Sequence, residues 1–195
     1  MFNINKFSTE INNNGVLKSN RFIVDFGLPK ALESNYNNTE VISLRCDNVQ
    51  WPGVSWATLE SPPRAGYGAT EIIPYAPIFE DISMNFIVDK NSYVHKFFFD
   101  WMNKIVNLRS EGQSRYRDGA FLVGYKNDYS SKINIKVHKE DSTGDGDWAM
   151  MGTLYRAFPR AMQSFDLNWA SNDDMIKLNI QFTYTDYYVE YNKLS

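Results

Sequence analysis

Hydrophobic and polar residues alternate in several short stretches of this chain, and a period of two is typical of half-buried β-strands. The stretches that alternate, or that are short and apolar, are 21–26, 41–49, 81–89, 120–125, 132–139, 150–157, 164–169 and 176–185. Pro159 is expected to end the strand at 150–157, and 164–169 is expected to form a β-hairpin with 176–185. The pattern predicts a mainly β fold, an antiparallel β-sandwich or open barrel with about seven or eight strands.

One amphipathic helix is predicted after the strand at 81–89. Asn91 or Ser92 is expected to cap its first turn. Its apolar residues recur at helical spacing, so that one face can pack on a sheet; they are Val94, Phe97, Phe98, Trp101, Met102 and Ile105. The fold class therefore includes a single flanking α-helix.

Prolines and glycines between residues 51 and 77 exclude a helix or a central strand there. The segments 54–59 and 69–75 can instead pair as a long protruding β-hairpin around a tip at 62–66. Aromatic residues are enriched where proteins meet, so the excursion and its flank predict a subunit interface. The residues assigned to it are Trp51, Trp56, Pro62, Pro63, Tyr67, Tyr75 and Phe79. The alternative is that the segment folds back over its own sheet.

The N-terminal residues 1–19 are polar, rich in asparagine and without a clear period, which predicts an arm that ends near the turn signal Asn13-Asn14-Gly15. The remaining residues, 20–195, are expected to form a single domain, which suits a chain of 195 residues.

Composition and charge narrow the functional classes. With 20 Lys and Arg against 23 Asp and Glu, the net charge is −3, which argues against a general nucleic-acid binder. The single cysteine, Cys46, excludes an internal disulfide. The chain shows no signal-peptide pattern and no apolar run of membrane-spanning length, so we expect it to be made and used in the cytoplasm unless another machine exports it.

The sequence offers little catalytic chemistry. His95 and His138 are far apart and neither has a metal-ligand partner at the usual spacing. The segment 144–147, Gly-Asp-Gly-Asp, lacks the ordered oxygen ligands of a calcium loop. We therefore expect no enzyme activity, no metal and no cofactor.

One face of the stretch 176–185 is entirely polar. Its residues are Lys177, Asn179, Gln181 and Thr183. Such a face suits a water-filled lumen as well as free solvent.

The order of these features resembles the tail tube proteins of contractile-tailed bacteriophages of the T-even type. The similarity covers about residues 20–187. In chain order, the segments that carry it are the strand at 20–24, the segment 44–53, the excursion ending Ile73-Pro74-Tyr75, the strand and helix at 82–105, and the segments 155–159, 167–169 and 182–186.

The resemblance implies hexameric rings whose sheets join into a ring-shaped barrel and which stack into a tube. It implies a structural virion protein, assembled in the host cytoplasm, that conducts the genome during delivery. Its partners would be further copies of itself, a surrounding tail sheath, and baseplate or tail-terminator proteins. DNA would pass as non-specific cargo, and the chain itself would not insert into a membrane.

Two alternatives remain open at this point. The arm and an enlarged loop at 140–150 leave room for a tube-like baseplate protein that initiates the tube. A monomeric β-sandwich glycan-binding module could also display Trp51 and Trp56.

Overall fold

Antiparallel β-strands make up most of the structure, a computed structural model that describes residues 3–61, 66–107, 123–139, 148–169 and 174–192. The strands are β1 (Phe22–Phe26), β2 (Cys46–Val49), β3 (Val54–Ser61), β4 (Glu71–Phe79), β5 (Ile82–Ile87), β6 (Ser131–His138), β7 (Trp148–Met162), β8 (Lys177–Thr183) and β9 (Asp186–Tyr191). The helical segments are α1 (Ile4–Asn14), the 3-10 turn η1 (Lys30–Leu32), α2 (Glu40–Leu44), α3 (Tyr93–Ile105) and α4 (Lys126–Tyr129).

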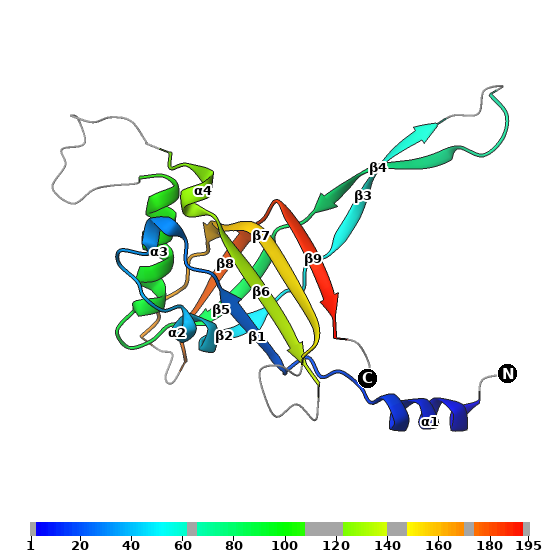
Figure 1. Ribbon diagram of the computed structural model, residues 1–195, viewed down its shortest axis with the longest axis horizontal. Coiled ribbons are helices and arrows are strands. Elements are labelled where there is room, and N and C mark those ends of the chain that lie inside the picture. Colours follow the sequence, from blue (N-terminus) through cyan, green and yellow to red (C-terminus); the bar gives the residue numbers. More distant parts are fainter. Residues whose placement is uncertain (1–2, 62–65, 108–122, 140–147, 170–173, 193–195) are drawn as a thin grey trace.

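The main sheet follows the order β1-β6-β7-β8-β5-β2, with β9 paired to β7 outside this path (Figure 1). β7 is 15 residues long and belongs to both halves of the sheet. Its first part pairs with β6 and β9, and its last part pairs with β8. Among the described strands the path does not return to β1, so the barrel is open. The predicted fold class, a mainly β antiparallel sandwich or open barrel with a flanking helix, is confirmed.

The core lies between the two halves of the sheet and α3. Alternation places Ile82, Met84 and Phe86 of β5 on the buried face, as predicted. The apolar face of α3 adds four fully buried side chains, which are Val94, Phe97, Phe98 and Trp101. The ring of Phe98 lies 4.7 Å from that of Phe86, and the Trp101 indole N–H donates a 2.7 Å hydrogen bond to the Tyr129 carbonyl. The one polar atom of this helix face is thus satisfied inside the core.

Asp89 supplies the side-chain acceptors just before the first turn of α3. The expected cap from Asn91 or Ser92 is wrong, because neither side chain bonds to that turn. The two Asp89 carboxylate oxygens accept hydrogen bonds from the backbone N–H groups of Asn91 and Val94, each at 3.1 Å. Desolvation opposes ionisation of this carboxyl, but the backbone N–H groups outweigh it and hold its pKa below the usual value. Ser92 instead adopts a left-handed conformation with φ 55°.

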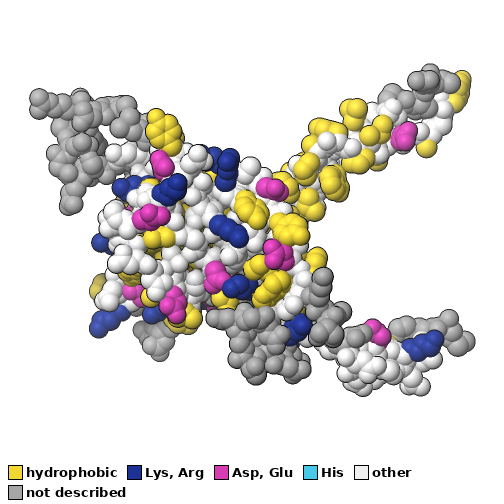
Figure 2. All heavy atoms as spheres, in the orientation of Figure 1, with side chains coloured by type: hydrophobic (Ala, Val, Ile, Leu, Met, Phe, Trp, Pro, Cys, Tyr) yellow, Lys and Arg dark blue, Asp and Glu magenta, His cyan; other side chains and the backbone are white. Residues whose placement is uncertain are grey.

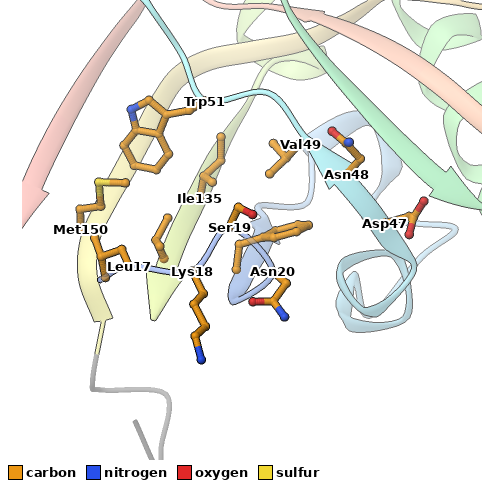
Figure 3. Close-up of a pocket in the computed structure, with 12 residues that line it drawn as sticks. Leu17, Lys18, Ser19, Asn20, Asp47, Asn48, Val49, Trp51, Ile135 and Met150 are labelled. Carbon is orange, nitrogen blue, oxygen red and sulfur yellow. The ribbon is translucent and has the colours of Figure 1, made fainter. Parts of the chain in front are cut away.

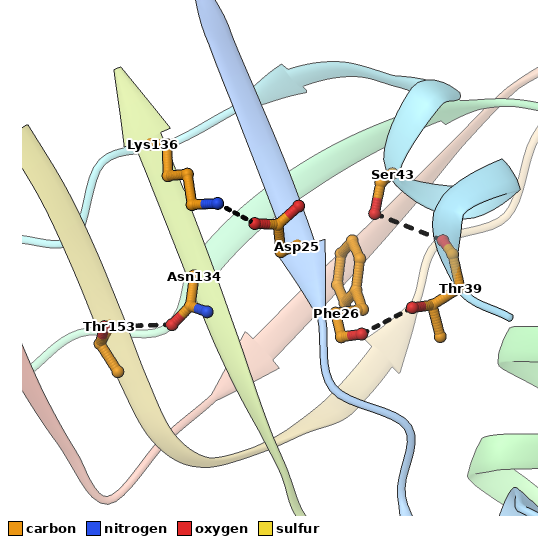
Figure 4. Close-up of polar contacts among 7 residues, drawn as sticks. All are labelled: Asp25, Phe26, Thr39, Ser43, Asn134, Lys136 and Thr153. Carbon is orange, nitrogen blue, oxygen red and sulfur yellow. Dashed lines mark hydrogen bonds and ion pairs between the residues drawn. The ribbon is translucent and has the colours of Figure 1, made fainter. Parts of the chain in front are cut away.

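The predicted strand at 41–49 is wrong in its first half, where α2 precedes the short strand β2. Ile42 is fully buried, and the Thr39 hydroxyl beside it donates a 2.7 Å hydrogen bond to the Phe26 carbonyl of β1 (Figure 4). This contact attaches the turn of helix to β1. A helix of five residues is too short to show a helical period in the sequence.

The N-terminal segment contains a helix, Ile4–Asn14, that was not predicted from the sequence. The Asn3 side chain accepts a 3.0 Å hydrogen bond from the Asn5 N–H at the first turn. At the other end Gly15 has φ 68° and donates to the Ile11 carbonyl at 2.8 Å, which is the usual role of glycine after a helix.

Strand pairing in the C-terminal half also differs from the prediction. Residues 163–169 are not a strand, and β8 pairs with β7 and β5. Pro159 does not end β7; it lies where the register with β8 shifts, a position that tolerates the missing N–H. Neither the strand β9 nor the short helix α4 was predicted.

Three sequence-based expectations fall partly or wholly outside the described residues. They are the first half of the strand at 120–125, the proposed loop at 140–150 except for its last residues, and the Gly-Asp-Gly-Asp segment at 144–147. In the described half of 120–125, Val123 forms an isolated bridge with Val106. Within the described ranges, none of the helices is long and apolar enough to span a membrane.

We predict that Phe98→Ala lowers the free energy of unfolding by about 3–5 kcal/mol, because it removes a fully buried ring from the core. Phe99→Ala is the matched control on the same helix, since Phe99 is 42% exposed, and it should cost less than about 1 kcal/mol. Urea denaturation of both variants measures the difference. Equal losses would show that α3 does not pack through the face described above.

Candidate assembly surfaces

The strands β3 and β4 form a two-stranded antiparallel hairpin that projects from the body (Figure 1). The predicted hairpin between 54–59 and 69–75 is present, but its second strand runs further, to Phe79. The ladder extends from Val54 opposite Phe79 to Ser61 opposite Glu71. A register shift between Ala57 and Thr58 accommodates Pro74, which cannot donate a ladder hydrogen bond. The alternative that the whole segment folds back over its own sheet is wrong for its outer part.

Apolar side chains cover the hairpin (Figure 2). The large exposed ones are Val54, Trp56, Leu59, Ile72, Ile73, Tyr75 and Ile78. They lie on both faces, because Trp56 is opposite Pro77 whereas Ile78 is opposite Ser55. An isolated two-stranded hairpin is marginally stable in water, and a contiguous exposed apolar patch marks an interaction site. The hairpin therefore carries apolar residues that are typical of a buried strand pair, yet it leaves them exposed to solvent.

The structure divides the predicted interface residues into two groups. Trp51 and Phe79, at the base of the hairpin, pack on the body: the Trp51 indole lies against Gly152, and Phe79 lies 5.9 Å from Tyr184 and 5.7 Å from Tyr187 between ring centres.

Trp56, Tyr67 and Tyr75 extend into solvent, with exposed fractions of 61%, 88% and 71%. Pro62 and Pro63 lie outside the described residues. Sequence reasoning missed Leu59, Ile72 and Ile78, because it weighed aromatic residues and passed over the aliphatic ones beside them.

The polar face of β8 continues across β5 and β2. The Asn179 side-chain amide donates 2.6 Å hydrogen bonds to the Ser83 hydroxyl and to the Asn85 side-chain oxygen Oδ1. Lys177 forms a 2.6 Å ion pair with Asp47 of β2. Gln181 lies opposite Ser83 on this face, and Thr183 is half-buried at its end. At the Thr183 end of the face, Arg160 forms a second ion pair with Asp81. The surface thus combines neutral amides and hydroxyls with two ion pairs, and it carries little net charge.

A second polar face lies on β1, β6 and β7 (Figure 4). Asp25 and Lys136 form a 2.6 Å ion pair across β1 and β6. The Thr153 hydroxyl donates a 3.1 Å hydrogen bond to Asn134, across β6 and β7. Both halves of the sheet therefore present a hydrogen-bonded polar outer surface.

The side chains that could carry catalysis do not converge. The ring of His95 contacts Phe99 and Phe165 beside α3, whereas His138 lies at the end of β6. Burial raises the pKa of the Cys46 thiol to about 12, so the thiol is protonated and unreactive at neutral pH. In the part of the chain that the structure describes, no three His, Cys, Asp or Glu side chains lie close enough to hold a metal ion.

Comparison with known families gives a match over most of the chain. The sequence model of a family described as phage tail tube protein matches residues 17–190. No match was found among curated proteins.

Several solved structures share the fold. A chain of the sheath–tube complex of an extracellular contractile injection system, PVC, in the extended state is 18% identical with a TM-score of 0.60, and the match covers 95% of this chain and 98% of that one. A chain of the anti-feeding prophage baseplate is 14% identical with a TM-score of 0.60, over 92% and 98% of the two chains. A chain of the PVC sheath/tube terminator is 18% identical with a TM-score of 0.58, over 90% and 96%.

We predict that Trp51→Ala lowers the free energy of unfolding of the monomer by about 2 kcal/mol, because its indole packs on Gly152. Trp56→Ala should change it by no more than about 0.5 kcal/mol, because that side chain is 61% exposed. Urea denaturation at a concentration where the protein is monomeric measures both variants. A large loss for Trp56→Ala would mean that the hairpin packs on its own body.

Proposed function

The chain belongs to the phage tail tube protein family, and we propose that it forms hexameric rings that stack into the inner tube of a contractile tail. The observation that carries this proposal is the hairpin β3–β4, whose apolar residues are exposed on both faces. A second copy of the chain would bury them. The family consists of structural tube proteins, so the function proposed is assembly, with no catalytic role.

The base of the hairpin supports its role as an assembly element. Trp51 and Phe79 anchor the base of the hairpin to the body, so its outer part projects from a defined attachment point. Aromatic anchors such as Trp56 and Tyr75 are then displayed with little loss of conformational entropy on binding. We assign the interface to Trp56, Tyr67 and Tyr75 together with the exposed aliphatic residues of the same strands, and we give Trp51 and Phe79 a supporting role.

The polar face of β8 supports a role as the wall of the tube. Lys177, Asn179, Gln181 and Thr183 present one cation, which Asp47 neutralises, beside uncharged amides and hydroxyls. A wall of this kind offers no cluster of cations to retain phosphates, so nucleic acid can move along it. We propose that this face lines the lumen and that DNA passes through as non-specific cargo during genome delivery.

The partners proposed follow from the assemblies in which similar folds occur. The solved chains come from sheath–tube, baseplate and terminator structures. We propose that this chain contacts a sheath around the tube and a baseplate or terminator protein at its ends, within a virion assembled in the host cytoplasm.

A tube-like baseplate protein is the second candidate, favoured by the fold shared with a chain of the anti-feeding prophage baseplate. The number of copies in each particle separates the two, because an initiator forms one ring and a tube subunit forms many. The glycan-binding alternative has less support, since the Trp51 ring packs on Gly152 and is not displayed as a sugar platform.

We predict that the wild-type protein forms rings or tubes in electron micrographs and that deletion of residues 60–68 abolishes them. The deletion removes the tip of the hairpin, Tyr67 included, and leaves the body unchanged, so the variant should stay folded and keep its circular dichroism spectrum. Normal tubes from the deletion variant would remove the tip and Tyr67 from the interface. A wild-type protein that stays monomeric across salt and protein concentration would contradict the proposed function.

We predict that Gln181→Arg tubes bind duplex DNA and protect it from nuclease, whereas wild-type tubes do neither. The substitution adds one unpaired cation per subunit to the proposed lumen wall, and repeated cations retain phosphates in a salt-dependent way. Co-sedimentation with and without nuclease measures the difference. DNA that binds but is digested would place Gln181 on the outside of the tube.

A further inference from the structure

The hairpin β3–β4 exposes large apolar side chains on two opposite faces. Residues directly opposite in an antiparallel ladder share a face, and successive residues of a strand alternate between faces. One face, called here the Trp56 face, carries Val54, Trp56 and Ile72. The other, called here the Leu59 face, carries Leu59, Ile73 and Ile78. The exposed fractions of these side chains range from 45% to 62%.

The register shift in the hairpin does not merge the two faces. The extra residue is Tyr75 on β4, whereas β3 continues from Ala57 to Thr58 without an insertion. Trp56 and Leu59 are three positions apart on this strand, so they point to opposite faces. Beyond the shift, Ile73 lies opposite Leu59. Each face therefore stays apolar on both sides of the shift.

A flat contact on a single face covers too little surface for a stable interface. β3 has 8 residues, so each face of the strand pair measures about 26 Å by about 10 Å, roughly 260 Å². Stable protein–protein interfaces bury about 800 Å² on each partner. A contact on one face would also leave the apolar side chains of the other face in water. Burial of both faces is therefore favoured.

A single partner would have to enclose the hairpin to cover both faces. The pocket lined by Trp51, Ile135 and Met150 has a volume of about 540 Å³ and opens beside Phe22, where β1 begins (Figure 3). A pocket of this size takes a small molecule or a few side chains, and a strand pair about 26 Å long does not fit in it. Two partners, one on each face, cover the hairpin without such a cleft.

We propose that the hairpin lies between two other copies of the chain, a neighbour in its own ring on one face and a copy of the adjacent ring on the other. The hairpin leaves the body at a single place (Figure 1), so within a ring of identically oriented copies it reaches the neighbour on one side only. The copy on the opposite face then belongs to the next ring. This three-copy junction rests on the ring assembly proposed above.

Leu59→Asp and Ile72→Asp test the two faces separately. Both side chains are 62% exposed, and they lie at neighbouring positions of the ladder on opposite faces. A carboxylate is strongly unfavourable in an apolar contact, so each variant should lose one of the two contacts. We expect one variant to form single rings that do not stack and the other to remain monomeric. Electron microscopy and sedimentation velocity of the purified protein distinguish these products.

Leu59→Ile and Ile72→Leu are the matched controls, and both should form tubes as the wild-type protein does. The melting temperature of the monomer should be the same in all four variants, because both side chains are exposed on the hairpin. A loss of assembly with an unchanged melting temperature separates a lost contact between copies from misfolding.

Cross-linking counts the partners of the hairpin directly. A photo-reactive residue is placed at position 59, at position 72 or at both, and this protein is diluted into a large excess of wild-type protein before tubes form. Each single substitution should join two chains, and the double substitution should join three. A double substitution that joins only two chains would overturn the three-copy junction, since both faces would then contact one copy.

The junction and the tube fail in different ways. If the wild-type protein forms tubes and either Leu59→Asp or Ile72→Asp does so equally well, the junction is overturned and the proposed function stands. Two variants that stop at the same stage of assembly overturn it as well. A wild-type protein that forms no rings overturns the proposed function itself.

Discussion

The sharing of β7 between both halves of the sheet is the constraint on which the rest of this structure depends. One part of the strand pairs with β6 and β9 and the other with β8, so the two halves cannot separate without breaking a continuous ladder. The halves therefore face each other at a fixed distance, and α3 completes the core by filling the space between them with Phe98 and Trp101. A register shift at Pro159 lets the strand turn from one half to the other.

Two parts of the chain, the hairpin β3–β4 and the helix α1, lie outside this core. The hairpin β3–β4 and the helix α1 both carry apolar residues and both project outward. Exposed apolar side chains are energetically unfavourable in a monomer. Contact between copies would remove this apolar surface from water, so such residues favour assembly. Trp51 anchors the hairpin through Gly152 and also lines a pocket beside residues 17–20.

The outer faces of the sheet, unlike the hairpin and α1, are polar. Their polar residues are paired with one another, as in Asp25 with Lys136 and Asn179 with Ser83 and Asn85. Side chains that already satisfy each other compete weakly for a ligand, which suits a surface past which cargo moves. The same chain thus combines exposed apolar projections with sheet faces whose polar groups are paired with one another.

Sequence alone determined the elements whose pattern is a local property. Successive residues of a strand point to opposite faces whatever the partner strand is, so the alternation in β5, β6 and β8 and the helical stripe of α3 could be predicted. Prolines, glycines and aromatic residues likewise indicated a protruding hairpin between residues 51 and 77.

The tertiary structure decided which strands pair, because pairing joins residues far apart in the chain. Alternation at 164–169 predicted a strand, but these residues do not pair with the sheet. The helix α2 at 40–44 forms where Ile42 is buried and the Thr39 hydroxyl bonds to the Phe26 carbonyl of β1. The division of the proposed interface residues into buried and exposed ones also depends on the tertiary structure. Trp51 and Trp56 are the same residue type five positions apart, and only the position of Gly152 makes one an anchor and leaves the other exposed.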